Sequence, residues 1–119
     1  MPPANTPYYL IDKQKLLPNL EVIDKVRAES GAKLLLALKC FASWCVFDLT
    51  PAPMDGTPSS SPYEARLGRE RFGGETHAYS VAFADNEIDE VIGHADKIIF
   101  NSISQLERFG DKATAIPRG

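Results

Sequence analysis

The stretch Leu34-Leu35-Leu36-Ala37-Leu38-Lys39-Cys40-Phe41 is an almost uninterrupted apolar run with a lysine near its end. A short continuous apolar run is typical of a buried parallel strand. A lysine at the carboxyl end of such a strand is unusual, because burying an unpaired ammonium group costs free energy. In a (β/α) barrel, the carboxyl ends of the strands carry the chemistry. Lys39 is therefore the first candidate for a functional residue.

Two interpretations of Lys39 are open at this point. In the first, desolvation favours the neutral amine, which is the form that attacks a carbonyl group to make a Schiff base. In the second, the lysine lies at a strand end and simply extends its ammonium group into solvent. The apolar run alone does not separate the two.

Composition limits the classes of protein. With 119 residues, 44% apolar and 24% charged, the chain resembles a soluble globular domain. The net charge is −3 and basic residues are scattered among acidic ones, so there is no basic stripe for nucleic acid. No apolar stretch approaches the roughly 20 residues of a membrane span, and residues 1–5 do not resemble a signal peptide. We expect a cytoplasmic protein that binds neither nucleic acid nor membrane.

Cysteine and histidine spacing gives no support to a metal site. Cys40 and Cys45 lie five positions apart, and neither belongs to a CxxC pair or to a cluster with zinc-ligand spacing. We expect no disulfide and no metal, and we expect both cysteines to be small core residues. His77 and His94 have no partners nearby in the sequence, and His94 falls where a helix should end.

Short apolar runs alternate with amphipathic stretches, which is the pattern of repeated βα units around a parallel sheet. Asp12, Ser43, Ser61, Asp85 and Ser102 are the expected helix caps. Strands are expected at residues 8–11, 33–40, 57–60, 76–83 and 97–100. Helices are expected from residue 13 to the glycine at 31, at 44–49, from 61 to the glycines at 73–74, at 86–94, and from 102 to 109–110.

This order of elements predicts an α/β fold. It corresponds to about the first four βα units of a (β/α)8 TIM-type barrel, because a closed barrel needs eight strands and about 250 residues. We divide the chain into an N-terminal segment with an opening strand (1–12), a partial barrel (13–110) and an irregular tail (111–119). Half a barrel leaves open sheet edges, so we expect a truncated barrel rather than a complete open domain.

Polar residues gather at the expected strand ends. Lys39 is followed by the stretch Thr57-Pro58-Ser59-Ser60-Ser61 and by Asn101-Ser102, and parallel strand ends converge on one face of a barrel. A face with an amine, several hydroxyl groups and helix N-termini suits an aldehyde cofactor that carries a phosphate. The sequence therefore predicts a cofactor site at this face.

Several stretches resemble the carboxynorspermidine (carboxyspermidine) decarboxylases, which are pyridoxal-phosphate enzymes with an alanine-racemase-like barrel. The resemblance covers about residues 7 to 110 and corresponds to the N-terminal part of a family member. Its most specific element is the lysine strand followed, in matching order and spacing, by the serine-rich strand end and Tyr63-Glu64-Ala65-Arg66-Leu67-Gly68. The stretches are Pro7-Tyr8-Tyr9-Leu10-Ile11-Asp12, Leu36-Ala37-Leu38-Lys39-Cys40-Phe41, Asp55-Gly56-Thr57, Ser59 to Gly68, and Ile99-Phe100-Asn101-Ser102.

The resemblance implies that Lys39 is the catalytic residue that binds pyridoxal 5'-phosphate covalently and is displaced by the substrate amine. It implies a carboxylated polyamine as the substrate and a homodimer as the intact enzyme. It also implies that the phosphate loop and the acidic partner of the pyridine nitrogen lie beyond residue 119, so no residue here is assigned to those roles.

Glu64 and Ser61 are the further cofactor-binding candidates that the resemblance implies. Each has an alternative role, because a serine at a helix cap and a glutamate three residues later form a capping box without any catalysis. Asn101 and Ser102 could contact a ligand from a strand end, and Ser102 has the same alternative, because it can form a capping box with Gln105 three residues later.

The sequence departs from the family at Pro51, Pro53, Pro58 and Pro62. Pro58 is expected to weaken strand pairing beside the site, because proline cannot donate to a ladder. Two other functions stay open: a related decarboxylase of diaminopimelate or an ornithine-like amino acid, and a non-catalytic barrel fragment that acts as an interaction module.

Overall fold

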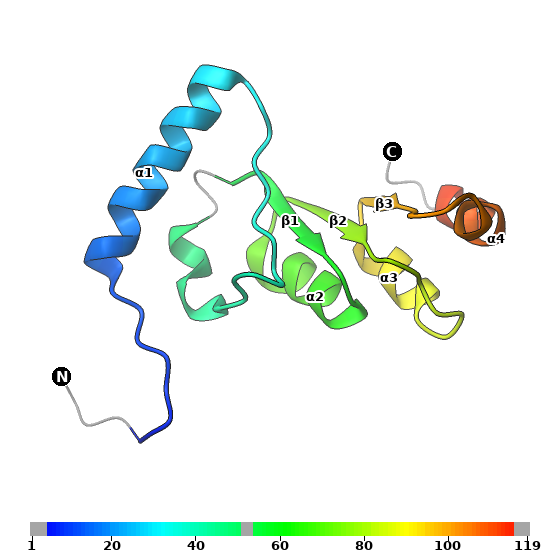
Figure 1. The fold of residues 1–119 in the computed structure, drawn as a ribbon, viewed down its shortest axis with the longest axis horizontal. Coiled ribbons are helices and arrows are strands. Elements are labelled where there is room, and N and C mark those ends of the chain that lie inside the picture. Colours follow the sequence, from blue (N-terminus) through cyan, green and yellow to red (C-terminus); the bar gives the residue numbers. More distant parts are fainter. Residues whose placement is uncertain (1–4, 51–53, 116–119) are drawn as a thin grey trace.

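A computed structural model describes residues 5–50 and 54–115, while residues 1–4, 51–53 and 116–119 lie outside this description. Its centre is a parallel sheet of three strands in the order β1 (Gly56–Ser59), β2 (Glu75–Tyr79) and β3 (Lys97–Ile99) (Figure 1). Gly56 pairs with Glu75, and His77 pairs with Lys97. The expected α/β class with a parallel sheet is therefore confirmed, whereas the count of four βα units is not.

The segment that carries Lys39 runs beside β1 but is not a regular strand. The Leu36 N–H donates to the Gly56 carbonyl at 2.9 Å, and the Leu38 N–H donates to the Pro58 carbonyl at 3.3 Å. Between these two bonds, a parallel ladder would use an N–H of residue 58 to reach the Leu36 carbonyl, and proline has none. Only one isolated bridge, Leu35 to Gly56, is formed. The strand expected at 33–40 is thus reduced to this bridge, and Pro58 provides the physical reason.

The first helix, α1 (Lys13–Ser30), begins and ends where the sequence predicts. Asp12 caps it by accepting from the Gln14 N–H at 2.9 Å, and Gly31 ends it in the left-handed conformation with φ 68°. Its apolar stripe is largely uncovered, since Leu20 is the one residue of the helix that is buried. A bidentate pair between Arg27 and Asp55, with N–O distances of 2.6 and 2.9 Å, ties the end of α1 to the sheet.

The next helical elements are the 3-10 helix η1 (Trp44–Leu49) and α2 (Pro62–Leu67), which continues into the π-helical turn η2 (Gly68–Phe72). The continuous helical segment of α2 and η2 packs closely on β1, because a Cβ added at Gly68, the first residue of η2, would lie 2.2 Å from Thr57 Oγ1. Ala65 is fully buried in the same helix. The small residues of the Tyr63 to Gly68 motif therefore allow α2 to approach the sheet.

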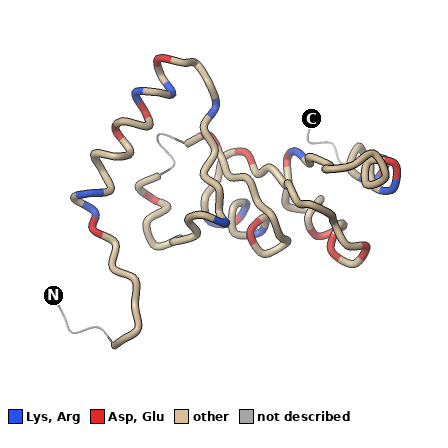
Figure 2. The backbone as a smooth tube through the Cα atoms, in the orientation of Figure 1, with Lys and Arg blue, Asp and Glu red and all other residues tan. Residues whose placement is uncertain are grey.

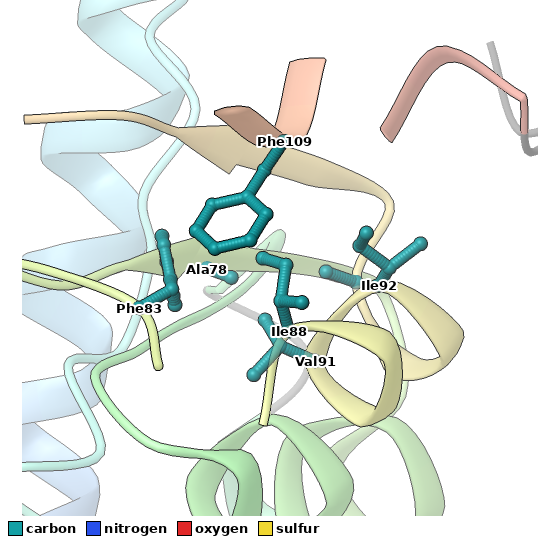
Figure 3. Close-up of a cluster of buried hydrophobic side chains, with 7 residues drawn as sticks. Ala78, Phe83, Ile88, Val91, Ile92 and Phe109 are labelled. Carbon is teal, nitrogen blue, oxygen red and sulfur yellow. The ribbon is translucent and has the colours of Figure 1, made fainter. Parts of the chain in front are cut away.

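The remaining helices, α3 (Ile88–His94) and α4 (Ile103–Thr114), form the larger hydrophobic core with β2. In Figure 3, Phe109 of α4 points toward Ala78 and Ile88. The buried members are Ala78, Phe83, Ile88, Val91, Ile92, Ala95 and Phe109. A smaller cluster joins Leu38, Phe47 and Phe72, and the rings of Phe47 and Phe72 meet edge to face at 5.1 Å.

Other expectations about the elements were also wrong. Residues 8–11 form no strand, and Tyr9 is completely exposed. Asp85 does not cap α3, because the helix begins three residues later and the Asp85 carboxylate pairs with Arg108. Helix α4 continues to Thr114, past Gly110, so at least the first part of the segment 111–119 is helical.

The cysteines also differ from expectation. Both Cys40 and Cys45 are free and exposed rather than part of the core. Cys40 lies in the turn that follows the Leu34–Leu38 segment, and Cys45 is an exposed residue of η1, next to the buried Val46 and Phe47.

Charged residues of both signs lie along the whole described chain, as Figure 2 shows. Within residues 5–50 and 54–115, no helix is long and apolar enough to cross a membrane.

Candidate functional site

Alternation along the strands separates two faces of the sheet. Thr76 and Ala78 of β2 are buried on the face that α2 and α3 cover, as are Thr57 and Ser59 of β1. Glu75, His77 and Tyr79 of β2 project to the opposite face, which is more open. Lys39 also reaches this open face, because Leu35 pairs with Gly56 and each second residue along the two segments lies on the same side.

Lys39 lies at the carboxyl end of the sheet, in a cavity of about 220 Å³. The chain turns there, because the N–H groups of Cys40 and Phe41 both donate to the Ala37 carbonyl, at 3.0 and 3.1 Å. The side chain is exposed rather than desolvated, contrary to the first interpretation of the apolar run. Residues 34–38 of the run are half-buried or buried, and Leu38 is only 2% exposed. The turn explains this difference, since it carries Lys39 out of the packed layer.

The cavity combines an amine with hydroxyl groups and apolar surface. Besides Lys39, its lining residues are Ala37, Pro58, Ser59, Ser60 and Tyr79. Among the residues with described positions, no acidic side chain forms an ion pair with Lys39. An accessible amine without a carboxylate partner is free to react with a carbonyl group.

Ser61 and Glu64 hold the rim of this cavity from α2. Ser61 Oγ accepts from the Glu64 N–H at 3.2 Å, so Ser61 is the helix cap, as predicted. The Glu64 carboxylate accepts from the Ser60 N–H at 2.6 Å. The glutamate therefore reaches one residue beyond the usual capping box and fixes Ser60, which lines the cavity. Neither Ser61 nor Glu64 lines the cavity itself, and their contact with a cofactor stays a prediction.

Tyr79 is the residue that the sequence argument missed. It is the last residue of β2, on the same face as Lys39, and its hydroxyl donates to Asn101 Oδ1 at 3.3 Å. The expected strand ran to residue 83, so Tyr79 was not recognised as a residue at a strand end. Asn101 is brought to the site through this bond, whereas Ser102 is the cap of α4 and accepts from the Gln105 N–H at 3.3 Å.

The amino end of the same face holds a network of ion pairs around Glu75. Its carboxylate accepts from Lys33, from His77 Nε2 at 2.8 Å and from Lys97 at 3.1 Å. The Lys33 hydrogen bond, followed by those of His77 and Lys97, lowers the pKa of the Glu75 carboxyl from 4.5 to about 2. The neighbouring Asp55 carboxyl has its pKa lowered from 3.8 to about 2, first by its hydrogen bond with Arg27 and then by the Leu34 N–H.

No grouping of histidine, cysteine and acidic side chains suited to a metal ion occurs where the structure is described. His94 lies in the last turn of α3, where the sequence predicted a helix end. His77 is engaged with Glu75 rather than directed to the Lys39 cavity.

Comparison with known proteins supports a decarboxylase-like segment. No family model matches the chain. A carboxynorspermidine/carboxyspermidine decarboxylase of Herminiimonas arsenicoxydans is 70% identical over 115 residues, which cover 97% of this chain and 32% of the relative. A protein of the same name from Campylobacter jejuni is 37% identical, with 90% of this chain and 28% of the relative covered. A carboxyaminopropylagmatine decarboxylase of Synechocystis is 31% identical, with 96% and 30% covered.

The fold gives the same result. The crystal structure of carboxynorspermidine decarboxylase from Campylobacter jejuni, complexed with norspermidine, superposes with a TM-score of 0.87 at 36% identity and covers 93% of this chain and 30% of that chain. This chain thus spans about a third of the length of the curated relatives it matches. The resemblance inferred from the sequence is confirmed: nearly the whole chain is similar to a segment of the carboxynorspermidine/carboxyspermidine decarboxylases.

Proposed function

We propose that this chain supplies the lysine-bearing part of a pyridoxal-phosphate-dependent decarboxylase that converts carboxynorspermidine or carboxyspermidine to norspermidine or spermidine and CO2. The observation that carries the proposal is Lys39, an amine that has no ion partner among the described residues and lies in a cavity at the carboxyl end of a parallel sheet. This is the edge at which α/β barrels hold their reacting groups. The similarity to decarboxylases over nearly the whole chain selects the reaction.

The residues of the cavity fit one part of pyridoxal phosphate. Lys39 provides the amine for the aldehyde carbon, and Ala37, Pro58 and the Tyr79 ring provide apolar surface for a planar ring. The cavity of about 220 Å³ is smaller than the roughly 300–1,000 Å³ of typical ligand pockets, so this segment forms one part of a larger site. No residue of this segment is assigned to the phosphate or to the pyridine nitrogen.

When it is bound, pyridoxal phosphate supplies an electron sink for the pair left by a departing carboxylate. Lys39 would hold the cofactor through its amine, and its Nζ would be the atom that carries a proton once the amine is free. Glu64 holds Ser60, which lines the cavity, by accepting from its N–H. Ser61 caps α2 and so supports the helix turn that carries Glu64. The chain thus positions and anchors the cofactor.

The names of the relatives suggest two candidate substrates. The 70% identity to a carboxynorspermidine/carboxyspermidine decarboxylase favours a carboxylated polyamine of that kind. Carboxyaminopropylagmatine is the second candidate, because a decarboxylase of that name is 31% identical over 116 residues. We also propose a homodimer in the cytoplasm as the state of the complete enzyme.

A chimera tests the proposed function. Residues 5–115 would replace the matching segment of the Herminiimonas arsenicoxydans relative, and release of CO2 from carboxynorspermidine would be measured. We expect turnover that is abolished by Lys39→Ala and by Lys39→Arg, because a guanidinium stays protonated and cannot form the link. Lys33→Arg is the matched control and should keep turnover. Equal activity of the Lys39→Ala and unchanged chimeras would contradict the proposal, and an inactive chimera that folds and binds substrate would favour a non-catalytic interaction module.

A further inference from the structure

We infer that Tyr79 is a binding residue of the Lys39 cavity: its ring is the wall against which the planar ring of an aromatic aldehyde lies when that aldehyde is attached to Lys39. Asn101 is the positioning residue that holds this wall. The inference deepens the proposed function and rests on it, since it concerns the ligand that the same lysine would take.

The register of the sheet brings Tyr79 and Lys39 to one level. The Leu38 N–H donates to the Pro58 carbonyl, which aligns Ala37 with Pro58, and Pro58 pairs with His77. Two residues farther along each segment lie Lys39, residue 60 and Tyr79. These three side chains therefore form a row across three neighbouring segments on the open face, and all three line the same cavity.

A core role does not explain Tyr79. The ring belongs to neither hydrophobic cluster and is 40% exposed, whereas its neighbour in the strand, Ala78, is 1% exposed on the helix-covered face. A tyrosine with one side toward a cavity and its hydroxyl bonded elsewhere is suited to binding, because the apolar ring and the polar tip serve separate partners.

The bond to Asn101 restrains the hydroxyl end of the Tyr79 ring. Tyr79 pairs with Ile99 in β3, and Asn101 follows two residues later, so the Tyr79 hydroxyl reaches along the neighbouring segment to Asn101 Oδ1 at 3.3 Å. The ring is thereby held at its far end, and its face stays available to the cavity. Planar rings prefer an offset-stacked or edge-to-face contact with such an aromatic face, which an aliphatic aldehyde cannot make.

Competitive labelling of lysines within the unchanged 119-residue chain tests this inference. The chain would be treated with pyridoxal phosphate or with propanal, reduced with borohydride and mapped by peptide mass spectrometry. The measured quantity is the ratio of label on Lys39 to label on Lys33. We expect Tyr79→Leu to lower this ratio by about two- to tenfold with pyridoxal phosphate and to leave it unchanged with propanal.

Two further variants make the result specific. Tyr63→Leu removes an exposed tyrosine of α2 that is outside the cavity, and it should leave both ratios unchanged. Asn101→Ala keeps the Tyr79 ring but removes the acceptor of its hydroxyl. The ratio of label on Lys39 to label on Lys33 with pyridoxal phosphate should then lie between the ratios of the unchanged chain and of Tyr79→Leu. Circular dichroism of each variant would verify that the fold is retained.

The outcomes distinguish a failure of the role of Tyr79 from a failure of the role of Lys39. An unchanged pyridoxal phosphate ratio in folded Tyr79→Leu would overturn the role of Tyr79 and leave the role of Lys39 intact. An equal fall with both aldehydes would also overturn it, because the effect would then come from the amine and not from ring contact. The absence of any preference for Lys39 in the unchanged chain would overturn both this inference and the proposed function.

Discussion

The two ends of the open sheet face use lysine in opposite ways. At the amino end, Lys33 and Lys97 both bind the Glu75 carboxylate, and His77 completes the network. At the carboxyl end, Lys39 has Ser60 and Tyr79 around it but no carboxylate within the described part of the chain. The same segments therefore supply charge neutralisation at one end and a free amine at the other. The difference indicates that the amino end stabilises the fold and that the carboxyl end is available for chemistry.

The largest loss of stability is expected from Gly68→Ala, which moves the helix that supports the carboxyl end of the sheet. The new Cβ would lie 2.2 Å from Thr57 Oγ1, so α2 must move away from β1 and carry Ser61 and Glu64 with it. We expect a loss of about 1–3 kcal/mol in the free energy of unfolding, measured with urea. The double variant with Thr57→Ala should recover part of the loss, because Thr57 Oγ1 has no hydrogen-bond partner to lose among residues 5–50 and 54–115.

Gly93→Ala is the matched control for Gly68→Ala. A Cβ at Gly93, inside α3, would meet no atom within 4 Å. Alanine there should leave stability unchanged or raise it by up to about 1 kcal/mol, because it favours a helix over glycine. A Gly68→Ala chain as stable as the unchanged chain would contradict the close packing of α2 on the sheet.

The second prediction concerns the amino end and its response to acid. The pKa of the Glu75 carboxyl is lowered to about 2 in the folded chain from its ordinary value of 4.5. Its contribution to stability is therefore complete above pH 4.5 and is lost as the pH falls toward 2. We expect the unfolding temperature of the unchanged chain to fall more steeply over this range than that of Glu75→Gln. Parallel curves for the two chains would show that the network adds no stability.

A smaller effect is expected from Glu64→Gln, which separates the capping role from a cofactor role. A glutamine oxygen can still accept from the Ser60 N–H, so the cost in stability should be about 1 kcal/mol or less. Turnover of the chimera described above would be measured alongside. A large loss of turnover at normal stability would assign the Glu64 charge to the cofactor, whereas normal turnover would limit Glu64 to the rim.

The smallest effect on stability is expected from Pro58→Thr. The new N–H can donate to the Leu36 carbonyl, a gain of about 0.5–1.5 kcal/mol, which is offset by the greater freedom of the unfolded chain once proline is removed. The informative measurement is hydrogen exchange at the Leu38 amide, which bonds the residue 58 carbonyl. We expect slower exchange at the Leu38 amide, because the new bond would join the Leu36 and Leu38 hydrogen bonds into one continuous ladder. Unchanged exchange would mean that Pro58 does not interrupt this ladder.

The sequence predicted the parts of the fold that local chemistry decides. The caps Asp12, Ser61 and Ser102 and the stop at Gly31 are where we expected them, because a short polar side chain or a left-handed glycine acts within one turn of backbone. The strands expected at 57–60, 76–83 and 97–100 likewise match β1, β2 and β3 to within a few residues.

Features that depend on distant contacts were harder to predict. The segment 8–11 has a strand pattern but lies exposed, since a strand requires a neighbour that pattern alone does not provide. The apolar run left open whether Lys39 is desolvated or extends into solvent, and the turn after Leu38 exposes it. Gln105 looked like the second half of a capping box, yet its side chain accepts from the Phe83 N–H at 2.8 Å. Tyr79 became recognisable only through the register of β1 and β2.

The most direct test of the central claim is the position of the covalent label. The complete chimera would be incubated with pyridoxal phosphate, reduced with borohydride and digested, and the modified lysine would be identified by mass spectrometry. We predict that the label lies on Lys39, because it is the lysine of the carboxyl-end cavity and has no carboxylate partner within the described residues. Label found mainly on Lys33 or Lys97 would contradict the assignment of Lys39 as the lysine that holds the cofactor.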